Sequence, residues 1–267
     1  MKLPVESIVL CEGVHDRAFW KGWLEHLGCQ DARPKLPTGG YGKALDPFGK
    51  DVAQGHFALR TASDAFVRIR PCNGDKGVLA ELKKRLAERT TNGLRRLVVG
   101  LDLDNDVADS AADAERTARL REGIEKRIRL ADPTATSTGD GDFSLDGGDT
   151  IVSLVLWSAA DAHTPELPRK QTLERLVCAA FRSAHPDRAA AVAAWLASRP
   201  APPAASPKEH AWSHMAGWYA DKNCDDFYQH VWREDAVVRE LKARLELSGA
   251  WQIASALVSS AAPRGAA

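Results

Sequence analysis

Three carboxylates follow an apolar run in the middle of the chain, at alternating positions. The run covers residues 97–101, and Asp102, Asp104 and Asp106 come directly after it. Because side chains of a strand alternate between its two faces, aspartates with this spacing would project from one side of a strand end. Carboxylate oxygens are ligands that Mg²⁺ and Mn²⁺ prefer, alongside waters and substrate phosphate. The spacing fits a divalent metal site, and it also fits a solvated turn or a helix N-cap.

A second acidic segment follows another apolar run near the N-terminus. Residues 7–11 are apolar apart from Ser7, and Glu12 and Asp16 come next in the sequence Glu-Gly-Val-His-Asp. If both apolar runs are strands of one parallel sheet, their carboxyl ends meet at the same edge, where ligands bind in such sheets. We therefore expect Glu12 and Asp102 to lie at a common edge, which unrelated acidic turns would not do.

The remaining periodicity predicts an α/β fold with a mostly parallel four-stranded sheet flanked by helices and a helical C-terminal extension. The expected strands cover residues 7–11, 66–69, 94–101 and 151–157. The expected helices cover residues 16–27, 78–89, 110–130, 173–184, 186–198, 208–219 and 225–248. Segments 30–62 and 133–148 are rich in turn-forming residues and are predicted as a long loop and an exposed connection. Residues 1–165 form the expected α/β domain, and residues 166–267 form the expected helical region packed on it, with a disordered tail.

Two motifs and the segment between them resemble a known family. The first is Ile-Val-Leu-Cys-Glu-Gly-Val-His-Asp at residues 8–16, and the second is Val-Val-Gly-Leu-Asp-Leu-Asp at residues 98–104. Between them, residues 67–77 combine a strand, a Gly-containing turn and the start of a helix. Their order and spacing resemble the Toprim domain shared by type IA and II topoisomerases, bacterial primases and overcoming-lysogenization-defect (OLD) nucleases. The resemblance covers roughly residues 5–180 and is closest to small stand-alone Toprim proteins related to the OLD-type nucleases.

The resemblance implies roles for the acidic residues of both motifs. Glu12 corresponds to the glutamate that acts as general acid/base or binds metal, and Asp102 and Asp104 correspond to the aspartates that hold Mg²⁺ or Mn²⁺. Asp106 is an additional candidate ligand. A phosphodiester develops charge on its oxygens as it is cleaved, and a cation held by carboxylates stabilises that charge.

Five further residues are candidates with open alternatives. Asp16 corresponds to a second acidic metal position of OLD-like nucleases, and alternatively it is an acid favoured by a helix N-terminus. Glu174 resembles the Leu-Glu that follows the fourth strand in small Toprim proteins, and alternatively it is a surface glutamate. Lys208, a candidate catalytic cation, and Lys222 are alternatives for contacting phosphate, and His15 is either a phosphate or metal contact or a loop histidine.

The resemblance implies a metal-dependent phosphodiesterase that cleaves nucleic acid, DNA rather than RNA, with a role in defence against phage or plasmids. A protein partner such as an ATPase belongs to the same analogy. Topoisomerase activity is disfavoured because it needs a nucleophilic tyrosine and a large gate, and the chain has only Tyr41, Tyr219 and Tyr228 in 267 residues. A non-catalytic Toprim module that binds nucleotide or nucleic acid is an alternative.

A haloacid-dehalogenase-like phosphatase is the second alternative, because its motif is also Asp-x-Asp after a strand. Asp102 would then be the nucleophile and Asp104 the acid/base. Asp106 stands where that family usually has Thr or Val, and the motif lies far from the N-terminus. Glu12 and Asp16 would have no role in this alternative.

Composition limits the remaining classes. The chain has 44% hydrophobic residues and a formal net charge of zero, so a nucleic-acid partner needs a local basic surface rather than a global positive field. The five cysteines include no Cys-x-x-Cys pair, which favours reduced thiols over a zinc or disulfide framework. A leader peptide and a long apolar run are missing from the sequence, so we expect a soluble, cytoplasmic protein without a membrane contact.

Overall fold

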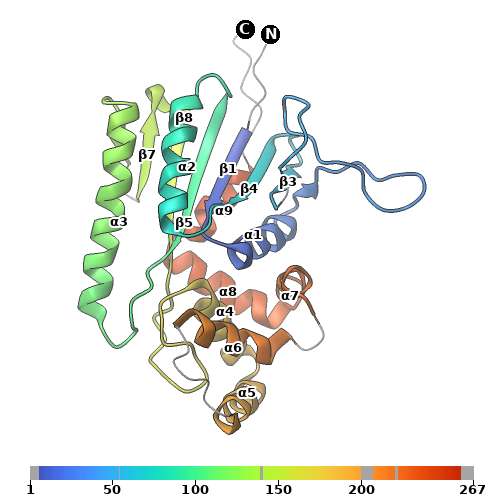
Figure 1. Cartoon of the computed structure of the whole chain (residues 1–267), viewed down its shortest axis with the longest axis vertical. Helices are drawn as coiled ribbons and strands as arrows, with labels where there is room; N and C mark the ends of the chain where they lie inside the picture. Colours follow the sequence, from blue (N-terminus) through green and yellow to red (C-terminus); the bar gives the residue numbers. More distant parts are fainter. Residues whose placement is uncertain (1–5, 54, 139–140, 200–206, 220–221, 260–267) are drawn as a thin grey trace.

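A mixed β-sheet flanked by helices on both faces forms the centre of the structure, a computed structural model (Figure 1). The structure describes residues 6–53, 55–138, 141–199, 207–219 and 222–259. Within these residues the sheet has eight strands in the order β2-β3-β4-β1-β5-β8-β7-β6. The predicted α/β class is confirmed, whereas the predicted number of four strands is wrong.

The four central strands are parallel and correspond to the four predicted ones. In order across the sheet they are β4 (Phe66–Pro71), β1 (Glu6–Cys11), β5 (Leu94–Asp102) and β8 (Thr150–Trp157). β1 and residues 97–101 of β5 are buried on both faces, which explains why these segments read as nearly continuous apolar runs. Because β1 and β5 are neighbours, Glu12 and Asp102 emerge side by side at one sheet edge.

Four short strands extend the sheet in antiparallel pairings. On the β4 side these are β3 (Phe57–Arg60) and β2 (Gln30–Asp31), and on the β8 side β7 (Asp142–Leu145) and β6 (Thr136–Ser137). They lie in the two segments that the sequence predicts as loop and connection. Strands of two to four residues are too short to show a period. The longer strands β4 and β8 hold β3 and β7 in place, and these in turn pair with β2 and β6.

The central strands send alternate side chains into two cores. Ile8 and Leu10 of β1 pack under α2 (Asp75–Glu88) and α3 (Ser110–Ala131), which cover one face. Val9 and Cys11 point to the other face, where α1 (Val14–His26) and the C-terminal helices share one core. This alternation fixes the register of β1, because a slip by one residue would exchange its two faces.

The C-terminal half is helical, as predicted, although its segmentation differs. The helices are α4 (Leu173–Ala184), α5 (Pro186–Ser198), α6 (Pro207–Tyr219), α7 (Cys224–Val231), α8 (Asp235–Leu247) and α9 (Ala250–Val258). The single helix predicted over residues 225–248 is wrong, because the chain turns between α7 and α8 and starts α8 from Glu234 in an extended conformation. The predicted disordered tail lies outside the described residues. Among the helices that the structure describes, none has the length and apolarity needed to span a membrane.

An aromatic cluster fixes α1 against the C-terminal helices. Trp23 stacks on Trp20 with a centroid distance of 4.9 Å and on Trp232, the residue after α7, at 5.4 Å. A Cβ atom at Gly22 would lie 2.7 Å from the carbonyl oxygen of Tyr228, so α1 and α7 approach too closely for a side chain there. Each large apolar side chain buried in this way contributes about 1.5–3 kcal/mol. Helix α1, which begins at Val14 shortly after Glu12, is therefore held by the core.

A tight turn after β4 supports the loop after β1. The N–H of Gly74 donates a 2.9 Å hydrogen bond to the carbonyl oxygen of Glu12, which ties the two strand ends together. The same turn brings the carbonyl oxygen of Cys72 within 1.6 Å of where a Cβ atom at Gly77 would lie. Only glycine fits at Gly77 without displacing this backbone.

Gly77→Ala is therefore expected to destabilise the protein by about 2–4 kcal/mol, because the new methyl group must displace the Cys72 carbonyl. Urea denaturation followed by circular dichroism measures this. Gly123→Ala in α3 is the matched control, because a Cβ atom there would meet only the end of Arg127 at 3.7 Å. This control should be neutral or stabilising by up to about 1 kcal/mol. Equal stability of both variants would contradict the steric argument.

Candidate functional site

A pocket of about 150 Å³ lies at the carboxyl ends of β1 and β5. Its wall includes five of the six acidic residues predicted as metal ligands, which are Glu12, Asp16, Asp102, Asp104 and Glu174. They come from three parts of the chain that are up to 162 positions apart, from 12 to 174. The sequence prediction that the two acidic motifs meet at one sheet edge agrees with this geometry.

Glu12 and Asp102 are oriented by backbone donors. The N–H of Asp102 donates a 2.8 Å hydrogen bond to Oε1 of Glu12. Oδ1 of Asp102 accepts a 2.9 Å hydrogen bond from the N–H of Leu173, the first residue of α4. The N-terminal end of a helix favours a negative charge there. These bonds use one oxygen of each carboxylate and leave the second oxygen for another ligand.

Asp104 reaches the pocket through an unusual backbone conformation. Its φ angle is 60°, in the left-handed region that Asp tolerates better than most residues. Its N–H donates a 2.9 Å hydrogen bond to the carbonyl oxygen of Gln171, in the segment that leads into α4. The chain thus turns directly after Asp102, and the turn returns Asp104 to the pocket wall.

Asp16 forms part of the pocket wall and also caps α1. Its Oδ2 accepts a 3.2 Å hydrogen bond from the N–H of Gly13, and its Oδ1 accepts a 3.0 Å hydrogen bond from Nε1 of Trp157. Both oxygens therefore have structural partners, and only 5% of the residue is exposed. The geometry assigns Asp16 a capping role, and a metal ligand at this position would need one of these bonds to exchange.

Glu174 is buried and forms an ion pair with His15. Their atoms Oε1 and Nδ1 are 3.3 Å apart. Burial lowers the pKa of His15, but hydrogen bonds to Cys224 and Glu174 outweigh it and raise the pKa to about 10. Conversely, burial raises the pKa of Glu174, and the bond to His15 outweighs it, so that the pKa of Glu174 is lowered. Trp212 of α6 stacks on His15 with a centroid distance of 5.8 Å. Glu174 thus lines the pocket and is not a surface glutamate.

The other carboxyl groups of the pocket have raised pKa values. Burial raises the pKa of Glu12 to about 7. The hydrogen bond from the N–H of Asp102 lowers this pKa, and the negative charge of Asp104 raises it. Burial and the charges of Glu174 and Glu12 raise the pKa of Asp16 to about 7. Burial and the charges of Asp16 and Glu174 raise the pKa of Asp102 well above its ordinary value. Protons or a bound cation would relieve this repulsion.

The donor set fits a hard divalent cation. The nearby ligands are carboxylate oxygens, and Mg²⁺ needs only one or two of them because it keeps several waters. Across the described residues, no three His, Cys, Asp or Glu side chains are already grouped to hold a metal ion. Glu12, Asp102 and Asp104 therefore line the pocket without forming a closed coordination cage.

Other candidates lie away from the pocket wall. Oδ2 of Asp106 is 2.9 Å from Nη2 of Arg169, and its Oδ1 accepts a 3.1 Å hydrogen bond from the N–H of Ala108. The pocket-lining residues in the described part of the chain do not include Asp106 or Lys222. Lys208 belongs to α6, but its side chain lies outside the described part of the structure.

The structure adds basic residues that the sequence interpretation missed. Lys170 lines the pocket four positions before Glu174. Nη2 of Arg116 in α3 lies 3.4 Å from Oδ2 of Asp75, the first residue of α2. The positive charges of Arg116 and Lys170 both act to lower the pKa of Asp104. The turn before Asp75 was predicted, but its approach to α3 depends on helix packing. No local sequence pattern points to Lys170, because it lies in the loop before α4 begins at Leu173.

Comparison with known proteins supports the fold only. Neither a protein-family model nor a curated protein sequence matches the chain. Its structure is similar to a crystal structure described as hypothetical protein PH0156 from Pyrococcus horikoshii OT3, with a TM-score of 0.64 and 18% sequence identity. The similarity covers 96% of this chain and 100% of the other. The whole α/β architecture with its helical extension is therefore shared with another protein.

The raised pKa of Glu12 predicts a pH-dependent stability in the absence of divalent cations. Its ordinary pKa is 4.5 and its folded pKa is about 7, so the folded protein binds more protons between these values. Proton binding by Glu12 therefore adds to the free energy of unfolding, on the order of 3 kcal/mol. This stabilisation is complete below about pH 4.5 and is lost as the pH rises through 7. Urea denaturation in EDTA across this range should show a smaller loss for Glu12→Gln than for wild type.

Glu122→Gln on the exposed side of α3 is the matched control and should keep the wild-type pH dependence. Gln at position 12 retains an oxygen that accepts the N–H of Asp102, so the comparison isolates the charge. Identical pH profiles of Glu12→Gln and wild type would contradict the burial of a titrating carboxyl group at this position.

Proposed function

We propose that this protein is a Mg²⁺- or Mn²⁺-dependent phosphodiesterase that cleaves nucleic acid, with DNA as the expected substrate. The parallel β4-β1-β5-β8 core and the two acidic motifs at its edge are the features in which it resembles a Toprim-type nuclease. A role in defence and an ATPase partner belong to the same proposal and rest on that resemblance alone.

The hydrogen bond between the N–H of Asp102 and the carboxylate of Glu12 carries the proposal. It connects the ends of two neighbouring parallel strands, so that the acidic residue of each motif faces the same pocket. Acidic residues that serve only solubility would be separated by their mutual repulsion, whereas these two lie close together, half-buried, in one pocket. A site that stores such repulsion fits the binding of a cation.

The residues of the pocket would have different roles in the reaction. Asp102, Asp104 and Glu12 would hold the cation, and a bound Mg²⁺ or Mn²⁺ supplies positive charge that polarises a phosphate and its attacking water. If Glu12 acts as the general acid/base instead of a ligand, it would exchange a proton with the attacking water or the leaving oxygen through Oε2, because its Oε1 accepts the N–H of Asp102. Lys170 lines the same pocket and would contact a phosphate oxygen.

The phosphatase alternative has less support. In the structure the N–H of Asp102 binds the carboxylate of Glu12, so the Asp-x-Asp motif shares its pocket with a second acidic motif that a phosphatase of this kind does not use. That alternative also leaves Glu12 without a role. Trapping of an aspartyl-phosphate on Asp102 would nevertheless establish it in place of the nuclease.

The purified protein is expected to cleave supercoiled, linear or single-stranded DNA when Mg²⁺ or Mn²⁺ is present and not in EDTA. Glu12→Gln and Asp102→Asn each remove a carboxylate of the pocket and should lower the cleavage rate by about 100-fold or more. Gel analysis of cleavage time courses measures the rates, and melting temperatures show whether each variant is folded.

Glu122→Gln removes an exposed carboxylate of α3 and should keep the rate of wild type. Wild type that binds these DNAs without cutting any of them, with either cation, would indicate a non-catalytic binding module. Unchanged rates in both pocket variants would place the chemistry elsewhere in the protein.

A further inference from the structure

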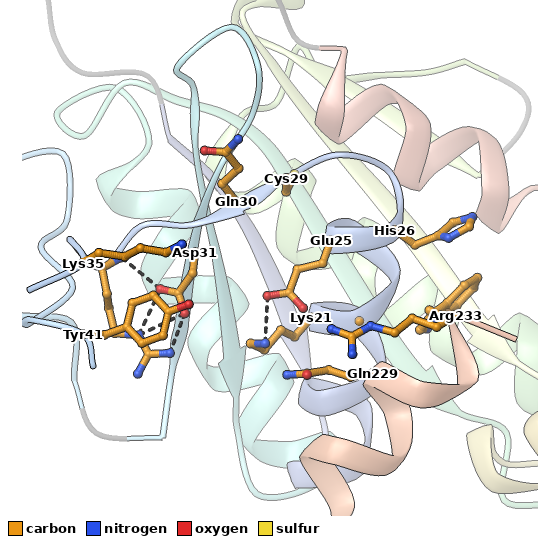
Figure 2. Close-up of a pocket in the computed structure, with 13 residues that line it drawn as sticks. Lys21, Glu25, His26, Cys29, Gln30, Asp31, Lys35, Tyr41, Gln229 and Arg233 are labelled. Atoms are coloured by element: carbon orange, nitrogen blue, oxygen red, sulfur yellow. Dashed lines mark hydrogen bonds and ion pairs between the residues drawn. The ribbon is translucent and has the colours of Figure 1, made fainter. Parts of the chain in front are cut away.

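A second, larger cavity lies beside the C-terminal half of α1. Its volume is about 840 Å³, and it lies between α1, α7 and the segment that follows β2 (Figure 2). The wall includes four basic residues, Lys21, Arg33, Lys35 and Arg233, and two acidic residues, Glu25 and Asp31. Since the chain as a whole carries no net charge, this cavity is a local concentration of positive charge.

Two of the basic residues are held in place by the two acids. Nζ of Lys21 lies 2.8 Å from Oε1 of Glu25, and Lys21 is only 6% exposed. Nε of Arg33 lies 3.0 Å from both carboxylate oxygens of Asp31. Within each pair the two charges cancel. The net positive charge of the cavity wall therefore comes from the other two basic residues.

Lys35 and Arg233 supply that remaining charge. Both are exposed, and neither forms an ion pair with an acidic side chain of the described residues. They approach the cavity from different sides, Lys35 from the loop after β2 and Arg233 from the end of α7 (Figure 2). Two cations on opposite walls of one cavity suit an anion between them, and phosphate is one of the biological anions that Arg and Lys bind.

The cavity also has room and an aromatic surface for more than a phosphate. Its volume lies within the range of about 300–1,000 Å³ that is typical of sites for small organic ligands. Tyr41 is 49% exposed, and the guanidinium of Arg33 lies 4.7 Å from its ring centroid. Aromatic rings beside cations stack on bases in proteins that bind single-stranded nucleic acid. The wall therefore combines a phosphate contact with a stacking surface, which is the chemistry of a nucleotide unit.

Helix α1 connects this cavity to the carboxylate pocket. Asp16 near its start lines the pocket, and Lys21 and Glu25 line the cavity. At 1.5 Å per residue, the two sites are separated by roughly 8–14 Å along the helix axis. A few nucleotides of one strand cover such a distance. The acidic pocket by itself repels a polyanion, so a substrate strand needs a basic contact nearby.

We infer that this cavity binds the phosphate and base of a single-stranded nucleic acid a few nucleotides away from the bond placed at the carboxylate pocket. The inference rests on the proposed function for the identity of the ligand, and it adds the surface that holds the strand. A free nucleotide shares the same chemistry, so mononucleotide and strand are tested separately.

The test is fluorescence anisotropy with a labelled single-stranded oligodeoxynucleotide of about 12 nucleotides, a length within the site sizes of such proteins. EDTA is present, so that binding is measured without cleavage. The variant Lys35→Ala/Arg233→Ala is compared with Lys83→Ala/Lys84→Ala, which removes two exposed lysines of α2 on the opposite face of the sheet. Both variants lose the same net charge, and all the substituted side chains are exposed, so both should fold.

The cavity variant should bind the strand about 20-fold more weakly than wild type at about 0.1 M salt, because two phosphate contacts are lost. The slope of log affinity against log salt should fall by about 1.4. The α2 variant should keep the wild-type affinity within about twofold, because lysines far from the strand are screened by salt. Thymidine monophosphate should bind wild type far more weakly than the oligonucleotide does.

Equal affinities of the two double variants would overturn the inference. Tight binding of the mononucleotide that is lost in the cavity variant would also overturn it, and would assign the cavity to a free nucleotide instead. Cleavage assays with Mn²⁺ separate this result from the proposed function. If the two variants differ in binding but wild type cleaves no DNA, the strand-binding role of the cavity is supported and the nuclease proposal is rejected. If both variants bind and cleave equally, the nuclease proposal is supported and the strand-binding role is rejected.

Discussion

The hydrogen bond from the N–H of Asp102 to the carboxylate of Glu12 is the contact on which the site depends. It exists because β1 and β5 are parallel neighbours with Leu10 opposite Val99, so that Glu12 and Asp102 follow within a few residues of the same pair. Leu173 then completes the arrangement by donating its N–H to Asp102 from the start of α4. Two strand ends and one helix start thus converge, and each backbone donor stabilises a negative charge that burial opposes.

The packing around this contact is correspondingly rigid. Tryptophans on α1 stack between the sheet and α7, and the turn at Gly74 and Gly77 fixes the loop that follows β1. His15 and Glu174 add a buried ion pair between α1 and α4. Carboxylates that repel one another can be kept close only when the backbone that carries them cannot move apart, and the two cores supply that constraint.

The sequence predicts the parts of the structure that depend on long local patterns. Buried strands such as β1 and β5 read as apolar runs, and the acids after them indicated a shared sheet edge. The short strands β3 and β7 were missed because four residues show no reliable period. Lys170 was missed because its position depends on the loop before α4, which the buried guanidinium of Arg175 holds by binding the carbonyl oxygens of Asp161 and Pro168. The basic cavity depends on residues as distant as Lys35 and Arg233, which no local pattern connects.

Binding of Mn²⁺ to the purified protein tests most directly whether these carboxylates form a cation site. Titration calorimetry of wild type should show binding that is lost or weakened by about tenfold or more in Asp102→Asn, since hard cations depend on charged oxygen ligands. The exposed-site variant Glu122→Gln should bind as wild type does. Undetectable binding to wild type, or equal binding to all three proteins, would contradict the assignment of Glu12, Asp102 and Asp104 to a divalent metal site.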